Sequence, residues 1–148
     1  MDVEIREMDI SDLSQIVQIE NESFVAPWSK DDIIYELNES PISHLIVATI
    51  NNVVVGFCDY WITYDSATIA QIAVDSKFRR MKIATKLLEE VVSDCYAKRA
   101  LNITLEVRLQ NENAIKLYEK NGFARVLVKP KYYTNGDDAL YMLRKVEM

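Results

Sequence analysis

The chain has 148 residues, with 17 basic and 23 acidic side chains and a formal net charge of −6. About half of its residues are apolar and 27% are charged, which excludes intrinsic disorder, a collagen-like repeat and a disulfide scaffold. A chain of this length usually forms one domain that buries roughly 70% of its unfolded surface, so residues 1–148 are expected to form a single domain.

The net charge and the small numbers of cysteine and histidine residues limit what the protein is expected to bind. A net negative charge argues against a dedicated nucleic-acid binder, so we expect no direct contact with nucleic acid. Two cysteines, Cys58 and Cys95, and one histidine, His44, are too few for a metal framework, so no metal is expected. No apolar stretch approaches the roughly 18 residues that span a bilayer, and no leader pattern begins the chain, which predicts a cytoplasmic protein without a membrane partner.

The first 40 residues predict a strand and two helices. A short strand is expected over residues 3–8, followed by a helix that is capped by Asp9 or Ser11. A second helix is expected after Ser29, because Ser29 and Asp32 have the spacing of a capping box.

The middle of the chain is rich in β-branched and aromatic residues. These residues predict three strands over 44–50, 53–63 and 67–74, with a tight hairpin turn at Asn51–Asn52. The apolar spacing then changes to that of a helix, which is expected over residues 80–99.

The last third predicts three more strands and one short helix. Residues 102–109 alternate between apolar and polar side chains, as a strand with one buried face does. Asn111 is expected to cap a helix that ends at Asn121–Gly122, and two strands should follow, near 123–128 and 139–146. The resulting order predicts an α/β (α+β) protein whose mixed sheet carries helices on its faces.

The junction between the third central strand and the long helix is the most informative part of the sequence. The strand runs through a basic turn with Arg79, Arg80 and Lys82 directly into the helix. The first amides of a helix lack partners and attract anions, so this turn is a candidate phosphate or pyrophosphate site. A solvated basic helix start is the alternative, but cations at a helix N-terminus are unfavourable for stability, which favours a function.

This turn resembles the acetyl-CoA signature of the GNAT acetyltransferase superfamily, in which Arg or Gln is followed by a first Gly and then by Gly or Ala. Arg79 and Ala84 match its ends, and Lys82 stands where the family has its first Gly. If that position needs a positive φ, lysine costs about 1–2 kcal/mol there; if not, Lys82 supplements pyrophosphate binding. The resemblance implies that acetyl-CoA is bound by Ile72, Ala73, Val74, Arg79, Arg80, Met81, Lys82, Ile83, Ala84 and Thr85.

The resemblance extends over almost the whole chain. Residues 26–29, 105–123, 132–133 and 138–142 are similar at matching spacing to the ribosomal-protein-alanine N-acetyltransferase family. This implies a GNAT fold, with a mixed, mostly antiparallel twisted sheet of about seven strands and about four helices. It also implies direct transfer of an acetyl group, in a ternary complex, to the N-terminal α-amine of a protein, namely the terminal alanine of a basic small-subunit ribosomal protein.

The resemblance assigns Glu106 as general base, Tyr118 as general acid and Asn111 as a cofactor contact. From spacing alone, Glu106 is an exposed-face residue paired with a neighbour such as Arg108, Tyr118 is a core aromatic and Asn111 is a helix cap. We expect Glu106 to be partly desolvated and to act through a water. Cys95 fits the apolar stripe of the long helix, and Cys58 has no histidine near it in the sequence, so direct transfer is favoured over an acetyl-cysteine intermediate.

The acceptor is expected to lie between two loops, residues 24–29 and 129–138. By resemblance, Trp28, Tyr132 and Tyr133 line this groove, although isolated aromatic residues are more often core or loop anchors. Four acidic residues are candidates for binding a basic tail, with simple solubilisation as the alternative: Glu36, Glu39, Asp137 and Asp138.

The type of amine follows from the cost of deprotonation. At pH 7 deprotonation costs about 1.4 kcal/mol for an α-amine and about 4.6 kcal/mol for a lysine amine. An α-amine is therefore the easier acceptor to deprotonate. Two other hypotheses remain: acetylation of a small-molecule amine or lysine side chain, and a non-catalytic acyl-CoA-binding regulatory module. Lys82 favours the regulatory module, whereas Glu106 and Tyr118 argue against it.

Overall fold

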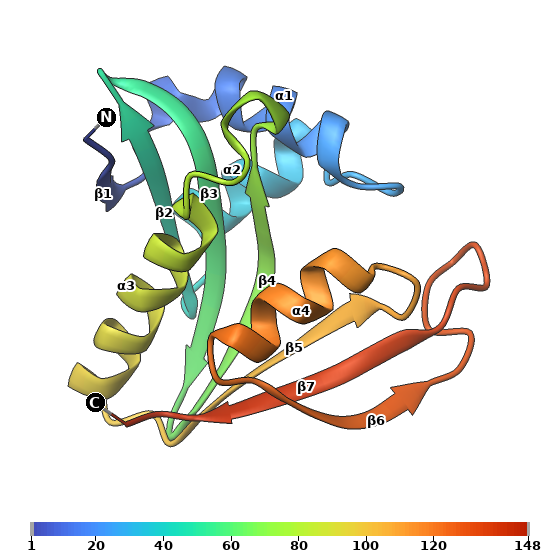
Figure 1. The fold of residues 1–148 in the computed structure, drawn as a ribbon. Helices are drawn as coiled ribbons and strands as arrows, with labels where there is room; N and C mark the ends of the chain where they lie inside the picture. The colour runs from blue at the N-terminus through green and yellow to red at the C-terminus, as the bar shows by residue number, and fades with distance from the viewer. Residues whose placement is uncertain (1, 148) are drawn as a thin grey trace.

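A computed structural model describes residues 2–147 of the chain. Within this range there are seven strands and four α-helices, in the predicted order and class (Figure 1). No helix in the described range is long and apolar enough to cross a bilayer. The elements are β1 (Glu4–Glu7), α1 (Leu13–Ser23), α2 (Lys30–Asn38), β2 (Ser43–Ile50), β3 (Val53–Thr63), β4 (Ser66–Val74), α3 (Ile83–Ala97), β5 (Asn102–Arg108), α4 (Glu112–Lys120), β6 (Ala124–Lys129) and β7 (Ala139–Lys145).

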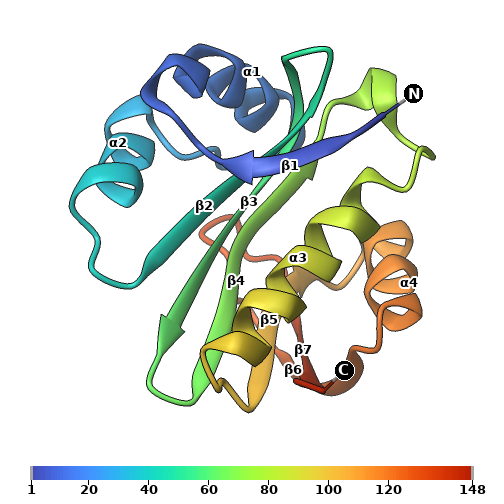
Figure 2. The same ribbon diagram turned by 90° about the vertical axis from the view of Figure 1, so that its left-hand side faces the viewer.

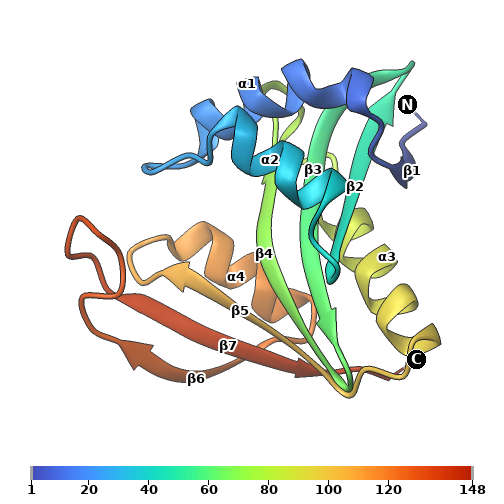
Figure 3. The ribbon, with the colours of Figure 1, turned by 180° about the vertical axis from the view of Figure 1, so that it is seen from behind.

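The strands form one sheet in the order β1-β2-β3-β4-β5-β7-β6. Neighbouring strands are antiparallel except for β4 and β5, which pair in parallel only where Ser66–Thr68 faces Asn102–Thr104. Beyond these residues β4 and β5 diverge, so the two halves of the sheet splay apart (Figures 1 and 3). The β5-facing edge of residues 69–74 therefore has no ladder partner within the described chain.

The helices cover the sheet unevenly. α1 and α2 pack on one face of β2, β3 and β4, whereas α3 packs on the other face (Figure 2). α4 shares the α3 side and covers β5, where Ile115 joins the core with Ile103 and Leu105. The core on the α3 and α4 side contains residues from both halves of the sheet and so joins them, and burial of each large apolar side chain contributes about 1.5–3 kcal/mol.

Most of the local signals are confirmed. Ser29 and Asp32 form the capping box of α2, and Asn51 and Asn52 have φ angles of 49° and 65°, as a two-residue hairpin turn requires. Asp9 caps a short 3-10 turn ahead of α1 rather than α1 itself.

One predicted helix boundary needs correction, and another is confirmed. The helix predicted over 80–99 begins only at Ile83, because Arg80 and Lys82 are left-handed, with φ angles of 68° and 59°. Apolar periodicity does not report such backbone angles. The predicted end of α4 is confirmed, because Asn121 is its C-cap and Gly122 follows with a left-handed φ of 91°.

A buried acidic pair lies between α2 and β3. Asp59 is only 1% exposed, and no N–H or O–H group of the described chain donates to either of its oxygens. It lies beside Glu36, which accepts hydrogen bonds from Trp61 Nε1 at 2.6 Å and Ser43 Oγ at 2.8 Å. Two carboxyl groups can share a hydrogen bond only if one is protonated. Burial, reinforced by Glu36, raises the pKa of Asp59 to about 9, so Asp59 carries the proton at pH 7.

Glu36 is the ionised partner of the pair. Partial burial tends to raise the pKa of Glu36, but the hydrogen bonds from Asp59, Trp61 and Ser43 outweigh it, and the pKa is lowered. These contacts occupy Glu36 inside the fold. This structural role differs from the expected binding of basic acceptor residues by Glu36.

Replacement of Asp59 by Asn should make stability less sensitive to pH. The folded protein keeps the Asp59 proton up to about pH 9, whereas the unfolded chain releases it near pH 4, so rising pH favours unfolding across this window. Because the asparagine side chain has no such proton and still donates to Glu36, the D59N protein should become the more stable of the two as pH rises. The difference should grow by at most about 1.4 kcal/mol per pH unit in urea unfolding between pH 5 and 9.

Asp65 provides the matched control, because it is an exposed aspartate in the turn that follows β3. The D65N protein should follow the wild-type pH dependence. Parallel wild-type and D59N curves would show that Asp59 is ionised in the folded protein.

Candidate active site

The end of β4 carries three of the predicted cofactor residues. Ala73 is buried, and Ile72 and Val74 are half-buried. A bulge at Ala70 precedes them, where one residue of β4 has no partner on β3. Bulges re-aim a strand, and the β5-facing N–H and C=O groups beyond this one remain available to a ligand.

The turn after β4 leads the chain into α3 through left-handed residues. Arg79 is extended, whereas Arg80 and Lys82 are left-handed, and all three side chains are exposed. Lys82 is the N-cap of α3 and makes no side-chain cap, so the first amides of α3 are left for another partner. The sequence left open whether the position of Lys82 needs a positive φ. The structure shows that it does.

The remaining residues of this turn divide between core and surface. Ile83 is buried in the main core, which makes its side chain structural, whereas Met81 and Ala84 are half-buried. Thr85 accepts a long hydrogen bond of 3.4 Å from Asn121, which links the start of α3 to the end of α4. The groups of this turn that suit an anion are therefore its backbone amides and its exposed cations.

Glu106 lies on β5, on the face that no helix covers. One of its oxygens, Oε1, is 3.7 Å from Lys129 Nζ and 3.5 Å from the hydroxyl of Tyr132, which donates to it. Lys129 Nζ also lies 4.6 Å from the ring centre of Tyr141, the cross-strand neighbour of Glu106. Glu106 is thus partly desolvated, as expected, and its ionic partner is Lys129 rather than Arg108.

Arg108 instead orders the loop between β6 and β7. Its guanidinium donates to Asp137 at 2.6 Å and lies 3.9 Å from the ring centre of Tyr133. Asp138 accepts a hydrogen bond from the Lys131 amide at 2.9 Å. Asp137 and Asp138 therefore fix this loop, which differs from their expected binding of a basic tail.

Tyr118 lies on the opposite side of β5 from Glu106. Its ring is buried with the core residues and packs edge-on against Phe123, so the core-aromatic interpretation is correct. Its hydroxyl has no hydrogen-bond partner among the side-chain contacts of the described chain. Burial raises the pKa of Tyr118, so this hydroxyl keeps its proton at neutral pH.

Asn111 and Trp28 have structural contacts that the sequence only partly anticipated. The Asn111 side chain accepts a hydrogen bond from the Ala114 amide at 3.2 Å, which confirms its cap. The Trp28 amide donates to Glu20 Oε2 at 2.8 Å, and its side chain packs against the α1–α2 core. In Figure 3 the loop that contains Trp28 and the β6–β7 loop project from the same side of the molecule.

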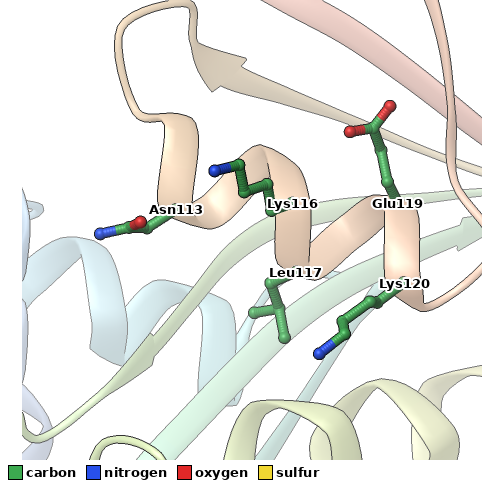
Figure 4. Close-up of a pocket in the computed structure, with 5 residues that line it drawn as sticks. All are labelled: Asn113, Lys116, Leu117, Glu119 and Lys120. Carbon is green, nitrogen blue, oxygen red and sulfur yellow. The ribbon is translucent and has the colours of Figure 1, made fainter.

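A shallow depression of about 660 Å³ lies along α4 (Figure 4). Leu117 and Lys120 point toward α3, whereas Glu119 points away. Lys116 and Asn113 complete the lining. The four-residue spacing of the two lysines was the signal in the sequence that could have identified this basic surface.

Comparison with known proteins agrees with this geometry. The sequence profile of the Acetyltransferase (GNAT) family matches residues 13–123. A Bacillus subtilis protein named as a candidate ribosomal protein bS18-alanine N-acetyltransferase is 37% identical over 139 residues, which are 93% of this chain and 92% of that protein.

Two solved structures share the fold over nearly the whole chain. The ribosomal-protein-S18-alanine N-acetyltransferase from Escherichia coli has a TM-score of 0.89 at 28% identity, over 99% of this chain and 96% of that one. A chain of the NatC complex bound to Gag peptide and CoA has a TM-score of 0.88 at 25% identity, over 99% of this chain and 100% of that one.

Replacement of Lys82 by Gly should stabilise the protein, although it introduces glycine at the start of a helix. Lysine at a left-handed φ costs about 1–2 kcal/mol, and glycine removes this penalty while increasing the entropy of the unfolded chain. The expected gain is about 0.5–1 kcal/mol, measured by urea unfolding.

The matched control is Lys86→Gly, one turn inside α3, where the same substitution should destabilise the protein by about 1 kcal/mol. Equal destabilisation by K82G and K86G would contradict a left-handed Lys82.

Proposed function

This chain belongs to the GNAT family of acetyltransferases, and from that premise we propose that it acetylates the N-terminal α-amine of a protein with acetyl-CoA as donor. The observation that carries the proposal is the divergence of β4 and β5. On one side of the divergence lie the unpaired edge of β4 and the basic turn that leads into α3. On the other side lies Glu106, beneath the loop that carries Tyr132.

The donor would lie along β4 and the turn that follows. The unpaired N–H and C=O groups at Ile72–Val74 suit the amide-bearing pantetheine arm, and they can stabilise an oxyanion. The uncapped start of α3 and the exposed Arg79, Arg80 and Lys82 suit the pyrophosphate. Asn111, the cap of α4, would be a further contact of the donor. The CoA bound in the NatC structure supports this donor.

The burial of each group supports the proposed acid and base roles. Glu106, desolvated but still reachable, would take the proton of the acceptor amine directly or through a water. Tyr118 would return a proton to the leaving thiolate, since its hydroxyl is protonated at neutral pH. An α-amine, which costs about 3 kcal/mol less to deprotonate than lysine, suits such a modest base.

The acceptor would enter between residues 24–29 and 129–138, with Trp28, Tyr132 and Tyr133 as its aromatic contacts. The Arg108–Tyr133 contact and the Trp28–Glu20 hydrogen bond make both loops ordered before binding. The names of the relatives support the N-terminal alanine of a ribosomal protein as acceptor, and hence a cytoplasmic site of action. One continuous sheet supports residues 1–148 acting as a single domain.

The proposal is tested by thiol release from acetyl-CoA with two acceptor peptides. One peptide begins with Ala and has every lysine blocked; the other has a blocked N-terminus and one free lysine. We expect turnover on the first peptide alone. Turnover on the second alone would transfer the function to side-chain amines, and acetyl-CoA binding without transfer to either would favour a regulatory module.

The two proposed proton-transfer residues should affect kcat and leave donor binding intact. Glu106→Gln and Tyr118→Phe should each lower kcat on the Ala peptide by about 10²-fold or more, the usual contribution of a general acid or base. The acetyl-CoA Kd, measured by calorimetry, should change less than twofold.

Glu112→Gln and Tyr35→Phe are the controls, since both residues are exposed. Wild-type kcat in E106Q or Y118F would remove that residue from the mechanism.

A further inference from the structure

Glu20 is a fully buried carboxylate in the last turn of α1. Its exposed fraction is 0%, and it forms no ion pair within the described residues. Its Oε2 accepts two hydrogen bonds of 2.8 Å, one from the Trp28 amide and one from Gln71 Nε2. Its second oxygen, Oε1, has no partner within the described chain.

A carboxylate in this position lowers the stability of the folded protein. Burying a charge without a cationic partner is unfavourable by several kcal/mol, and an apolar side chain of similar size would pack at lower cost. Burial raises the pKa of Glu20, while the hydrogen bonds from Trp28 and Gln71 oppose that shift. A residue whose burial weakens the fold is explained more easily by positioning than by stability.

The two donors of Glu20 belong to the two substrate regions. Trp28 lies in the loop between α1 and α2, which flanks the proposed acceptor groove. Gln71 lies on β4, directly after the bulge at Ala70 and directly before Ile72, where the proposed donor site begins. A single oxygen atom thus connects the acceptor loop to the donor strand.

We propose that Glu20 and Gln71 are positioning residues that hold the acceptor loop at a fixed distance from the acetyl donor. This inference rests on the proposed function. Glu20 touches neither reactant; it acts through the Trp28 amide. Loss of the link should therefore weaken acceptor binding while leaving the donor site intact.

Because Glu20 Oε1 has no partner within the described chain, substitutions of Glu20 can distinguish a role for its charge from a role for the hydrogen bonds that it accepts. Glutamine at position 20 can place its carbonyl oxygen where Oε2 lies and keep both hydrogen bonds. Its amide then replaces Oε1, which has no partner within the described chain. Methionine has a similar volume but accepts neither hydrogen bond.

The first readout is amide hydrogen exchange of residues 24–29, which does not depend on activity. Glu20→Met should lose protection in this loop by about tenfold or more in exchange rate, whereas Glu20→Gln should keep it. Glu22→Met, a change of the same type at an exposed position of α1, is the control. Wild-type protection in E20M would overturn the proposal.

The second readout separates the two Michaelis constants. E20M should raise KM for the Ala peptide about tenfold and change KM for acetyl-CoA less than about twofold, and E20Q should change neither. Equal increases in both constants would indicate general unfolding. A loss in E20Q equal to that in E20M would indicate a role for charge. Either result would overturn the proposal.

Gln71→Met provides a second variant if E20M does not fold, because it breaks the link to β4 and leaves the Trp28–Glu20 hydrogen bond in place. It should raise KM for the peptide alone. If wild-type protein acetylates neither peptide, the proposed function fails, whereas the exchange experiment still decides the positioning role.

Discussion

The short parallel ladder between β4 and β5 is the constraint on which the rest of the structure depends. The two strands stay paired only as far as Thr68 and Thr104, whose hydroxyls lie 3.3 Å apart, and then separate. Separation leaves polar backbone groups of β4 without partners, which a protein rarely accepts unless a ligand satisfies them. The helices hold this geometry, because α3 packs behind β4 and α4 packs behind β5.

Several unfavourable local features surround this divergence. Arg80 and Lys82 adopt left-handed angles, Asp59 is buried with a proton, and Glu20 is buried without a cation. Each costs stability, and the two apolar cores on either side of the sheet compensate for them. Strain and buried charge of this kind gather at functional sites because the surrounding packing can maintain them.

The charges near the proposed acceptor groove are largely committed to each other. Lys129 pairs with Glu106, and Arg108 pairs with Asp137 while stacking on Tyr133. The groove is therefore preorganised rather than simply acidic. An arriving α-amine would meet Glu106 among aromatic rings, where exclusion of water strengthens the interaction.

The sequence by itself determined the element order, the caps at Ser29 and Asn111, the hairpin at Asn51–Asn52 and the basic entry to α3, because these signals act between residues a few positions apart. It also carried the family resemblance from which the roles of Glu106 and Tyr118 are proposed. Only the tertiary structure decided which polar and charged side chains come into contact. Glu20 and Gln71 are 51 positions apart, and Trp61 lies 25 positions from Glu36. Such partners are set by strand register and helix packing, which bring together residues that no local pattern relates.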